Sequence, residues 1–177
     1  MKDRIFKNLL KEHKNRVYSY ALYFLHNRED AEDITQEVFI RVWKYQDRIR
    51  GKTVVPWLMK VTHNCCIDCI RKRKSERRNN YTESMDEFDT ISSDLDNYSS
   101  PESSYELSEM QKELLNALQT LPDKTRSMIL LHYFQGMRFD EIGEIFGTKS
   151  GTVKVAVHRG RKMLREILKE QFVEKRS

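Results

Sequence analysis

Three cysteines and a histidine lie within the seven residues from His63 to Cys69, and such groups could bind a metal or undergo redox chemistry. Cys65 and Cys69 are four residues apart, so on a helix they share its apolar face, where unpaired cysteine behaves as a small buried hydrophobe. His63 is not on that face, and a tetrahedral zinc site needs four converging ligands, usually from two segments. We therefore interpret Cys65, Cys66 and Cys69 as core residues and expect neither a metal nor a cofactor. Sensing of zinc or of redox state is the alternative interpretation.

Catalysis would need a nucleophile with its base, a set of metal ligands or a phosphate-binding loop. The remaining histidines, His13, His26, His132 and His158, are scattered along the chain. Glycine-rich dinucleotide, Walker and HExxH motifs do not occur. We therefore expect no enzymatic activity and no catalytic residue.

The charges are distributed unevenly along the 177 residues, and the distribution favours an anionic partner. Residues 1–78 carry a net charge of +9, residues 79–110 of −9 and residues 111–177 of +5, against +5 for the whole chain. The segment 79–104 is rich in Ser, Asp and Glu, and it has too little apolar surface to form a core. The pattern predicts two basic domains, 1–78 and 105–177, joined by a flexible acidic linker at 79–104, and basic surfaces favour nucleic acid.

Helical periodicity dominates the first domain, and only six Gly and three Pro in the chain argue against an all-β fold. We expect helices over residues 3–26, then from an N-cap at Asn27, and again from Pro56 onward, with a basic loop at 46–55. An apolar stripe should bury the second of these helices. Its predicted members are Ala31, Ile34, Val38, Val42 and Tyr45.

The second domain is expected to hold four helices, at about 105–119, 122–134, 139–146 and 150–170. Gly147 would end the third, and Ser150 would cap the fourth, which is basic. Two helices joined by such a short turn are typical of a helix-turn-helix, which binds duplex DNA. Its predicted core is Ile142, Ile145, Phe146, Val153, Val157 and Leu164, and its predicted DNA-facing residues include Lys149, Lys154, His158, Arg159, Arg161 and Lys162. The fold class expected for the chain is therefore all-α.

The expected location follows from composition. No apolar run approaches the roughly 18–20 residues that span a bilayer, and the N-terminus lacks the apolar segment of a signal peptide. Three unpaired, clustered cysteines indicate a reducing compartment. We expect a cytoplasmic protein with no direct membrane insertion.

Three segments resemble known motifs and occur in the same order as in one family. Residues 30–39 (DAEDITQEVF) are similar to the segment with which sigma-70-type factors bind core RNA polymerase. Trp57-Leu58 with Asn64, Asp68 and Arg71 resembles the following helix, which reads the −10 promoter element. Residues 139–165 look like the C-terminal helix-turn-helix that reads the −35 element. The two-domain size marks the extracytoplasmic-function (ECF) group of the family.

The resemblance implies a role for the acidic face of the second helix. In the family this face packs on a coiled coil of the polymerase clamp, so Asp30, Asp33, Gln36 and Glu37 would bind core polymerase. A merely solvated helix face is the alternative.

The resemblance also implies a −10 surface, which must read bases of melted DNA because a duplex hides the Watson–Crick edge. The loop 46–55 resembles a base-capturing loop, Asn64 lies where the family reads a base, and the basic run after it would bind phosphates. The expected residues are Arg48, Arg50, Lys52, Lys60, Asn64, Arg71, Lys72 and Arg73. Trp57 is expected in the core, with base stacking as its alternative.

The −35 surface implied by the resemblance lies in the major groove, where Lys and Arg reach guanine. The expected residues are Lys149, Ser150, Thr152, Lys154, Val155, His158, Arg159 and Lys162. The family usually has Ser-Arg-Leu after Thr-Val-Lys, whereas this chain has Val155-Ala156-Val157. The resemblance therefore implies the helix-turn-helix but does not assign its −35 sequence preference.

The partners that the resemblance implies are core RNA polymerase, at its clamp coiled coil and flap, promoter DNA, melted at −10 and duplex at −35, and an anti-sigma factor. The expected function is a transcription initiation factor that directs core polymerase to specific promoters. The alternative is a stand-alone helix-turn-helix regulator that binds duplex operators without polymerase and has no use for the acidic face.

Overall fold

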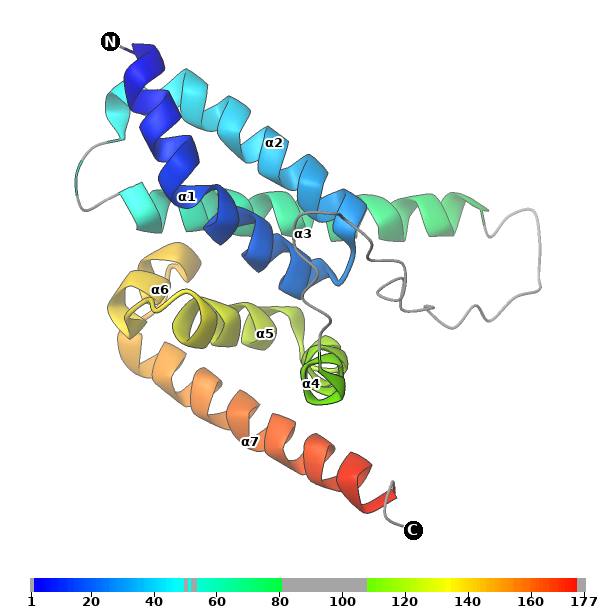
Figure 1. Cartoon of the computed structure of the whole chain (residues 1–177). Coiled ribbons are helices and arrows are strands. Elements are labelled where there is room, and N and C mark those ends of the chain that lie inside the picture. Colours follow the sequence, from blue (N-terminus) through cyan, green and yellow to red (C-terminus); the bar gives the residue numbers. More distant parts are fainter. Residues whose placement is uncertain (1, 50, 52–53, 81–107, 175–177) are drawn as a thin grey trace. The chain divides into compact units, whose positions relative to one another are not determined.

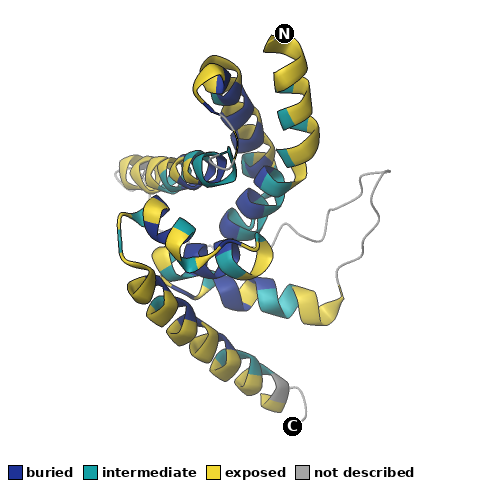
Figure 2. Cartoon of the chain, turned by 90° about the vertical axis from the view of Figure 1, so that its left-hand side faces the viewer, coloured by how far each residue is buried: buried dark blue, intermediate teal, exposed yellow. Residues whose placement is uncertain are grey.

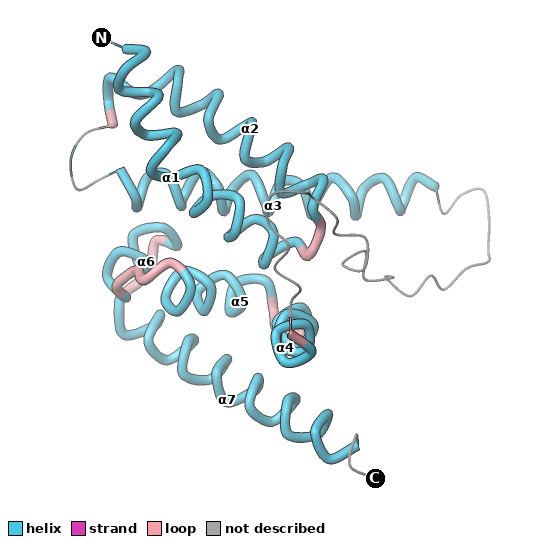
Figure 3. Tube along the Cα trace, viewed as in Figure 1, coloured by secondary structure: helices cyan, strands magenta, loops and turns pink. Residues whose placement is uncertain are grey.

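The computed structural model describes residues 2–49, 51, 54–80 and 108–174, and every element within them is helical. The order is α1 (Lys2–Leu25), α2 (Arg28–Tyr45), the short 3-10 helix η1 (Gln46–Arg48), α3 (Val54–Asn80), α4 (Glu109–Gln119), α5 (Asp123–Ile129), the π-helical η4 (Leu130–Phe134), α6 (Phe139–Phe146) and α7 (Ser150–Glu174) (Figure 1). Within the described part the connections are short, as Figure 3 shows. The all-α prediction is confirmed.

The helices belong to two compact units. The first contains α1, α2 and α3 from Val61 onward. The second contains α4 to α7, and the segment Ile49–Lys60 groups with it. The helix α3 ends at Asn80, two residues inside the predicted linker, and the rest of the linker and residues 105–107 lie outside the described residues. The domain boundaries therefore stay predictions.

Local signals fix the ends of the helices in the first unit. His26 adopts a left-handed conformation with φ 55°, which separates α1 from α2. The Asn27 side chain then accepts a hydrogen bond from the Asp30 N–H at 2.9 Å, so the predicted N-cap is confirmed. The predicted loop at 46–55 is shorter than expected, because Gln46–Arg48 is helical and α3 begins at Val54 rather than at Pro56. Arg50, Lys52 and Thr53 lie outside the described residues.

The core of the first unit forms where the apolar stripes of α1, α2 and α3 meet. The buried residues of α1 and α2 are Val17, Tyr20, Ala21, Phe24, Ala31, Ile34, Thr35, Val38, Phe39 and Val42. Tyr45 was predicted on this stripe and that prediction is wrong, since the side chain is 46% exposed. Tyr45 is the last residue of α2, and periodicity predicts the side of a helix but not how far its neighbours extend along it.

In the second unit, α4 begins with a capping box in which Ser108 and Gln111 each bond the other's backbone N–H. The predicted helix 122–134 changes at Leu130 from α- to π-helical geometry, which the sequence did not indicate. Gly147 ends α6 with φ 62°, as predicted. Ser150 is the first residue of α7 rather than its cap, so that prediction is wrong, because the backbone turns helical one residue earlier than expected.

The helix-turn-helix core formed largely as predicted. Ile142, Ile145, Val153, Val157 and Leu164 are all buried. The sixth predicted member, Phe146, is only half-buried, with the Lys124 ammonium 5.9 Å from its ring centroid. Because Val153, Val157 and Leu164 bury one side of α7, the other side of this helix is exposed, as Figure 2 shows.

Candidate nucleic-acid and protein interfaces

The predicted acidic face of α2 is exposed at three of its four predicted residues. Asp33, Gln36 and Glu37 all face solvent, since the apolar stripe turns the opposite side of the helix into the core. Arg41 donates a hydrogen bond to Glu37 at 2.8 Å, and this bond raises the pKa of Arg41 above its ordinary value. The same spacing of four residues joins Arg28 to Glu32 at 2.9 Å. Two carboxylates of α2, those of Glu32 and Glu37, are thus each held by an arginine of the same helix.

Asp30 differs from these three residues, with which it was predicted. Its side chain is only 19% exposed, and it forms an ion pair with the guanidinium of Arg73 on α3. Burial and then the nearby Asp30 carboxylate raise the pKa of the Cys69 thiol, one turn before Arg73. The structure therefore brings together two residues that were expected on different surfaces, Asp30 for polymerase and Arg73 for −10 DNA.

The other described residues predicted for −10 DNA lie on the solvent side of η1 and α3. Arg48, Lys60, Asn64, Arg71 and Lys72 are exposed, and Lys60, Asn64 and Arg71 share one helix face by their spacing. Arg71 and Lys72 have carboxylate partners only at the loose distances of 3.6 Å and 3.9 Å. Arg50 and Lys52 lie outside the described residues. Trp57 is half-buried, which leaves part of its ring accessible.

The cysteine cluster is embedded in the helix packing. Cys65 and Cys66 are buried and Cys69 is half-buried. Burial raises the pKa of the Cys65 thiol and also that of the Cys69 thiol, so both favour the protonated form. In the part of the chain that the structure describes, no three His, Cys, Asp or Glu side chains converge in a way that could hold a metal ion.

His63, the remaining member of that cluster, has a structural role. It is 7% exposed, its Nδ1 lies 3.1 Å from the Tyr20 hydroxyl, and its ring packs edge-on against Phe24. The sequence placed His63 off the apolar face of α3. It is buried all the same, because α1 covers the adjacent face.

All eight residues predicted for −35 DNA are exposed on α7 and on the turn before it. These are Lys149, Ser150, Thr152, Lys154, Val155, His158, Arg159 and Lys162. Val155 is 49% exposed, so its side chain is accessible to a partner. The opposite side of α7 carries the buried residues Val153, Val157, Gly160 and Leu164.

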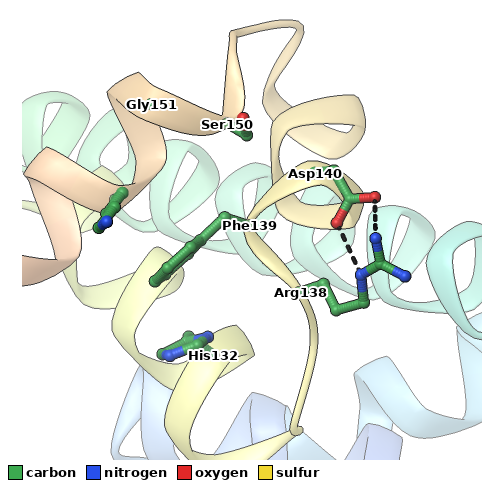
Figure 4. A pocket seen from close by; sticks show the side chains of 7 residues that line it. His132, Arg138, Phe139, Asp140, Ser150 and Gly151 are labelled. Atoms are coloured by element: carbon green, nitrogen blue, oxygen red, sulfur yellow. Dashed lines mark hydrogen bonds and ion pairs between the residues drawn. The ribbon is translucent and has the colours of Figure 1, made fainter.

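A hollow of about 540 Å³ lies beside the start of α7, between α7 and the chain that enters α6 (Figure 4). Its lining includes Lys154 and Arg138, and Arg138 donates two hydrogen bonds of 3.0 Å to Asp140. The Phe139 ring stacks on His132 with centroids 4.3 Å apart. Sequence reasoning missed Arg138 and His132. A basic residue directly before the first helix of a helix-turn-helix was the available signal for Arg138.

Arg126 is a third residue that sequence reasoning missed, and it holds the turn between α4 and α5. The residue is 5% exposed, and its guanidinium donates to the Gln119 carbonyl at 3.3 Å and to Asp123 at 2.8 Å. No pattern of spacing distinguishes this arginine from the surface ones.

Among the described helices, none combines the length and the apolar character needed to cross a membrane.

The same two parts of the chain match known families. Residues 9–76 match the Sigma-70 region 2 model, and residues 111–164 match the Sigma-70, region 4 model. The ECF RNA polymerase sigma factor SigW of Bacillus subtilis is 32% identical over 170 residues, which cover 93% of this chain and 89% of that protein. The ECF RNA polymerase sigma factor SigE of Mycolicibacterium smegmatis is 36% identical over 160 residues, which cover 90% of this chain but only 60% of that protein.

A solved structure shows the same likeness in three dimensions. The sigma factor RpoE from Bartonella quintana, co-crystallised with the anti-sigma factor NepR, superimposes with a TM-score of 0.74 at 25% identity. The match covers 96% of this chain and 98% of that one.

Proposed function

The chain belongs to the ECF group of the sigma-70 family, as an RNA polymerase sigma factor, and from this premise we propose how its surfaces act in transcription initiation. The family assigns no reaction to such a chain; its work is to bind core polymerase and to select promoters. We place it in the cytoplasm, where polymerase and DNA are.

The surface for core polymerase is the exposed acidic face of α2. Asp33, Gln36 and Glu37 point to solvent from one side of a helix whose other side is anchored in the core. The exposed carboxylates of Asp33 and Glu37 suit a basic partner, because charge complementarity speeds association and orients the two proteins. The clamp coiled coil is the partner that the family resemblance names for this face.

The surface for the melted −10 element is the solvent side of α3. Asn64 can both donate and accept hydrogen bonds, as reading a base edge requires. Arg71 and Lys72 follow two turns later and suit phosphates of a single strand. Their positions along one helix would let a strand run from the base-reading residue to the phosphate-binding residues.

The surface for the −35 element is the exposed side of α7. Lys154, Val155, His158 and Arg159 are solvent-facing on the second helix of a helix-turn-helix, the helix that enters the major groove in this motif. The half-buried Ala156 replaces the arginine that the family usually carries, so one charged contact is missing. Val155 suits the methyl group of thymine.

An anti-sigma factor is the regulatory partner that we propose. The support is the likeness to a sigma factor solved with its anti-sigma factor, at 98% coverage of that chain. Such a partner would act by covering the polymerase surface, the DNA surfaces or both.

The observation that carries the initiation-factor proposal is the coexistence of the exposed acidic face on α2 with a helix-turn-helix in one chain. A stand-alone operator-binding regulator needs the helix-turn-helix but not the acidic face. Transcription from sheared genomic DNA by core polymerase, with sequencing of the transcripts' 5′ ends, separates the two functions. We expect new start sites with a common pair of upstream elements only when chain and core are both present. Tight duplex binding by the chain alone, without new starts, would instead support the regulator.

A further inference from the structure

We propose that Asp30 and Arg73 form an intramolecular clasp that positions the end of α3 beyond Cys69, and that neither side chain contacts core polymerase or promoter DNA. The inference rests on the proposed function of α3 in holding the melted strand. The clasp gives Asp30 a different role from the other acidic residues of α2, and Arg73 a different role from the other basic residues of α3.

Asp30 is fixed at both its backbone and its side chain. The cap at Asn27 holds its N–H at 2.9 Å, so the carboxylate extends from an ordered first turn of α2. A negative charge in this turn is favoured by the helix dipole. Its side chain is 19% exposed, compared with 48% for Glu37, which leaves little of the carboxylate for a partner protein.

Arg73 is turned away from solvent relative to its neighbours. Its side chain is 40% exposed, whereas those of Arg71 and Lys72 are 76% and 79% exposed. Arg71 and Lys72 have carboxylate partners on α3 itself, and such pairs cannot orient the helix. The partner of Arg73 belongs to α2, so this pair ties two helices together.

The end of α3 needs such a tie because apolar packing stops before it. The last buried residue of α3 is Cys66, and from Arg71 to Asn79 every side chain except that of Arg73 is exposed. Figure 1 shows this end of α3 continuing past the start of α2. The ion pair between Arg73 and Asp30 therefore ties α3 to α2 beyond the last buried residue of α3.

The clasp has a consequence for promoter opening. If α3 frays or tilts beyond Cys69, Arg71 and Lys72 lose their fixed position relative to Asn64, although all three residues remain present. Loss of the clasp should thus weaken capture of the melted strand and leave the acidic face of α2 able to bind polymerase.

Hydrogen exchange on the full chain tests the clasp without polymerase or DNA. We expect Asp30→Asn and Arg73→Gln each to speed exchange of amides 70–78 by about three- to fivefold, the range that a partly exposed ion pair supports. The double variant should exchange no faster than either single one, because both remove the same interaction. Glu29→Gln, which removes a charge from the same turn of α2, and Lys74→Gln, which removes an exposed charge beside Arg73, should leave exchange unchanged. Equal exchange in Asp30→Asn and the unaltered chain would overturn the clasp.

Core polymerase binding then separates this inference from the proposed function. Asp30→Asn should bind core as the unaltered chain does, and its holoenzyme should open promoter DNA more slowly. If Asp30→Asn instead weakens core binding while exchange of amides 70–78 is unchanged, Asp30 is a polymerase contact and the clasp is wrong. If Asp33 and Glu37 prove dispensable for core binding, the assignment of the polymerase-binding surface is wrong, and the exchange result still stands.

Discussion

Gly160 of α7 lies so close to Ile129 of α5 that a Cβ atom at Gly160 would stand 2.5 Å from Cδ1 of Ile129. Cγ2 of Thr125 would be 2.6 Å away. Because glycine has no side chain, α7 can pack closely against α5 at Gly160. Because α7 carries the proposed −35 surface, the crossing also fixes how that surface is presented.

Gly160→Val should destabilise the second unit by about 1–3 kcal/mol, the usual cost of overpacking a core. Gly151→Val is the matched control, since nothing lies within 4 Å of a Cβ there and valine is a better helix former than glycine. Thermal unfolding followed by circular dichroism measures both. Equal melting temperatures for the two variants would contradict the close crossing.

Removing Asp33 and Glu37 together, as Asp33→Ala/Glu37→Ala, should weaken binding to core polymerase by about tenfold or more, because two exposed carboxylates are lost from a charged interface. Fluorescence anisotropy of the labelled chain titrated with core polymerase measures the change. Glu12→Ala on α1, an exposed acid away from this face, serves as the control. An unchanged affinity in the double variant would show that the acidic face is only solvated.

Lys154→Ala should change which −35 sequences the holoenzyme selects from randomised duplex DNA. A side chain that contacts a base edge contributes roughly 1–3 kcal/mol of discrimination at one position. Lys169→Ala, also exposed on α7 but four turns further along, should leave the selected sequence as it was. The same selected sequence from both variants would place Lys154 outside the base-reading surface.

The buried thiols should make the stability of the folded chain depend on pH. Burial holds the pKa values of Cys65 and Cys69 above the ordinary 9.0, so the folded chain keeps these protons to higher pH than the unfolded chain does. Their contribution to stability is therefore complete below pH about 9 and is lost as the pH rises through the folded pKa values. Urea unfolding between pH 8 and pH 10 should show a steeper loss of stability in the unaltered chain than in Cys65→Ala/Cys69→Ala.

Reaction with iodoacetamide gives an independent measure of the same property. At pH 8 the folded chain should react more slowly than the chain in urea, because a protonated and buried thiol is a poor nucleophile. Fast, complete modification of Cys65 in the folded chain would contradict the burial. It would also favour the redox-sensing alternative.

Much of this fold could be predicted from the sequence because its determinants are local. Asn27 caps α2 with a hydrogen bond that spans three residues, and Gly147 ends α6 because its own φ of 62° suits glycine. The stripes that bury Val38 and Val153 repeat with the period of the helix itself. The exposed residues proposed for polymerase and for DNA follow as the complement of those stripes.

Only the tertiary structure decided which of these residues face each other. Asp30 and Arg73 lie on separate helices, and so do Tyr20 and His63, so their contacts depend on how the helices cross rather than on any spacing in the chain. For the same reason Tyr45, on the expected stripe, proved exposed. Periodicity determines which side of a helix is apolar, whereas the extent and angle of the neighbouring helices determine which polar residues on its flanks are paired, buried or free to bind a partner.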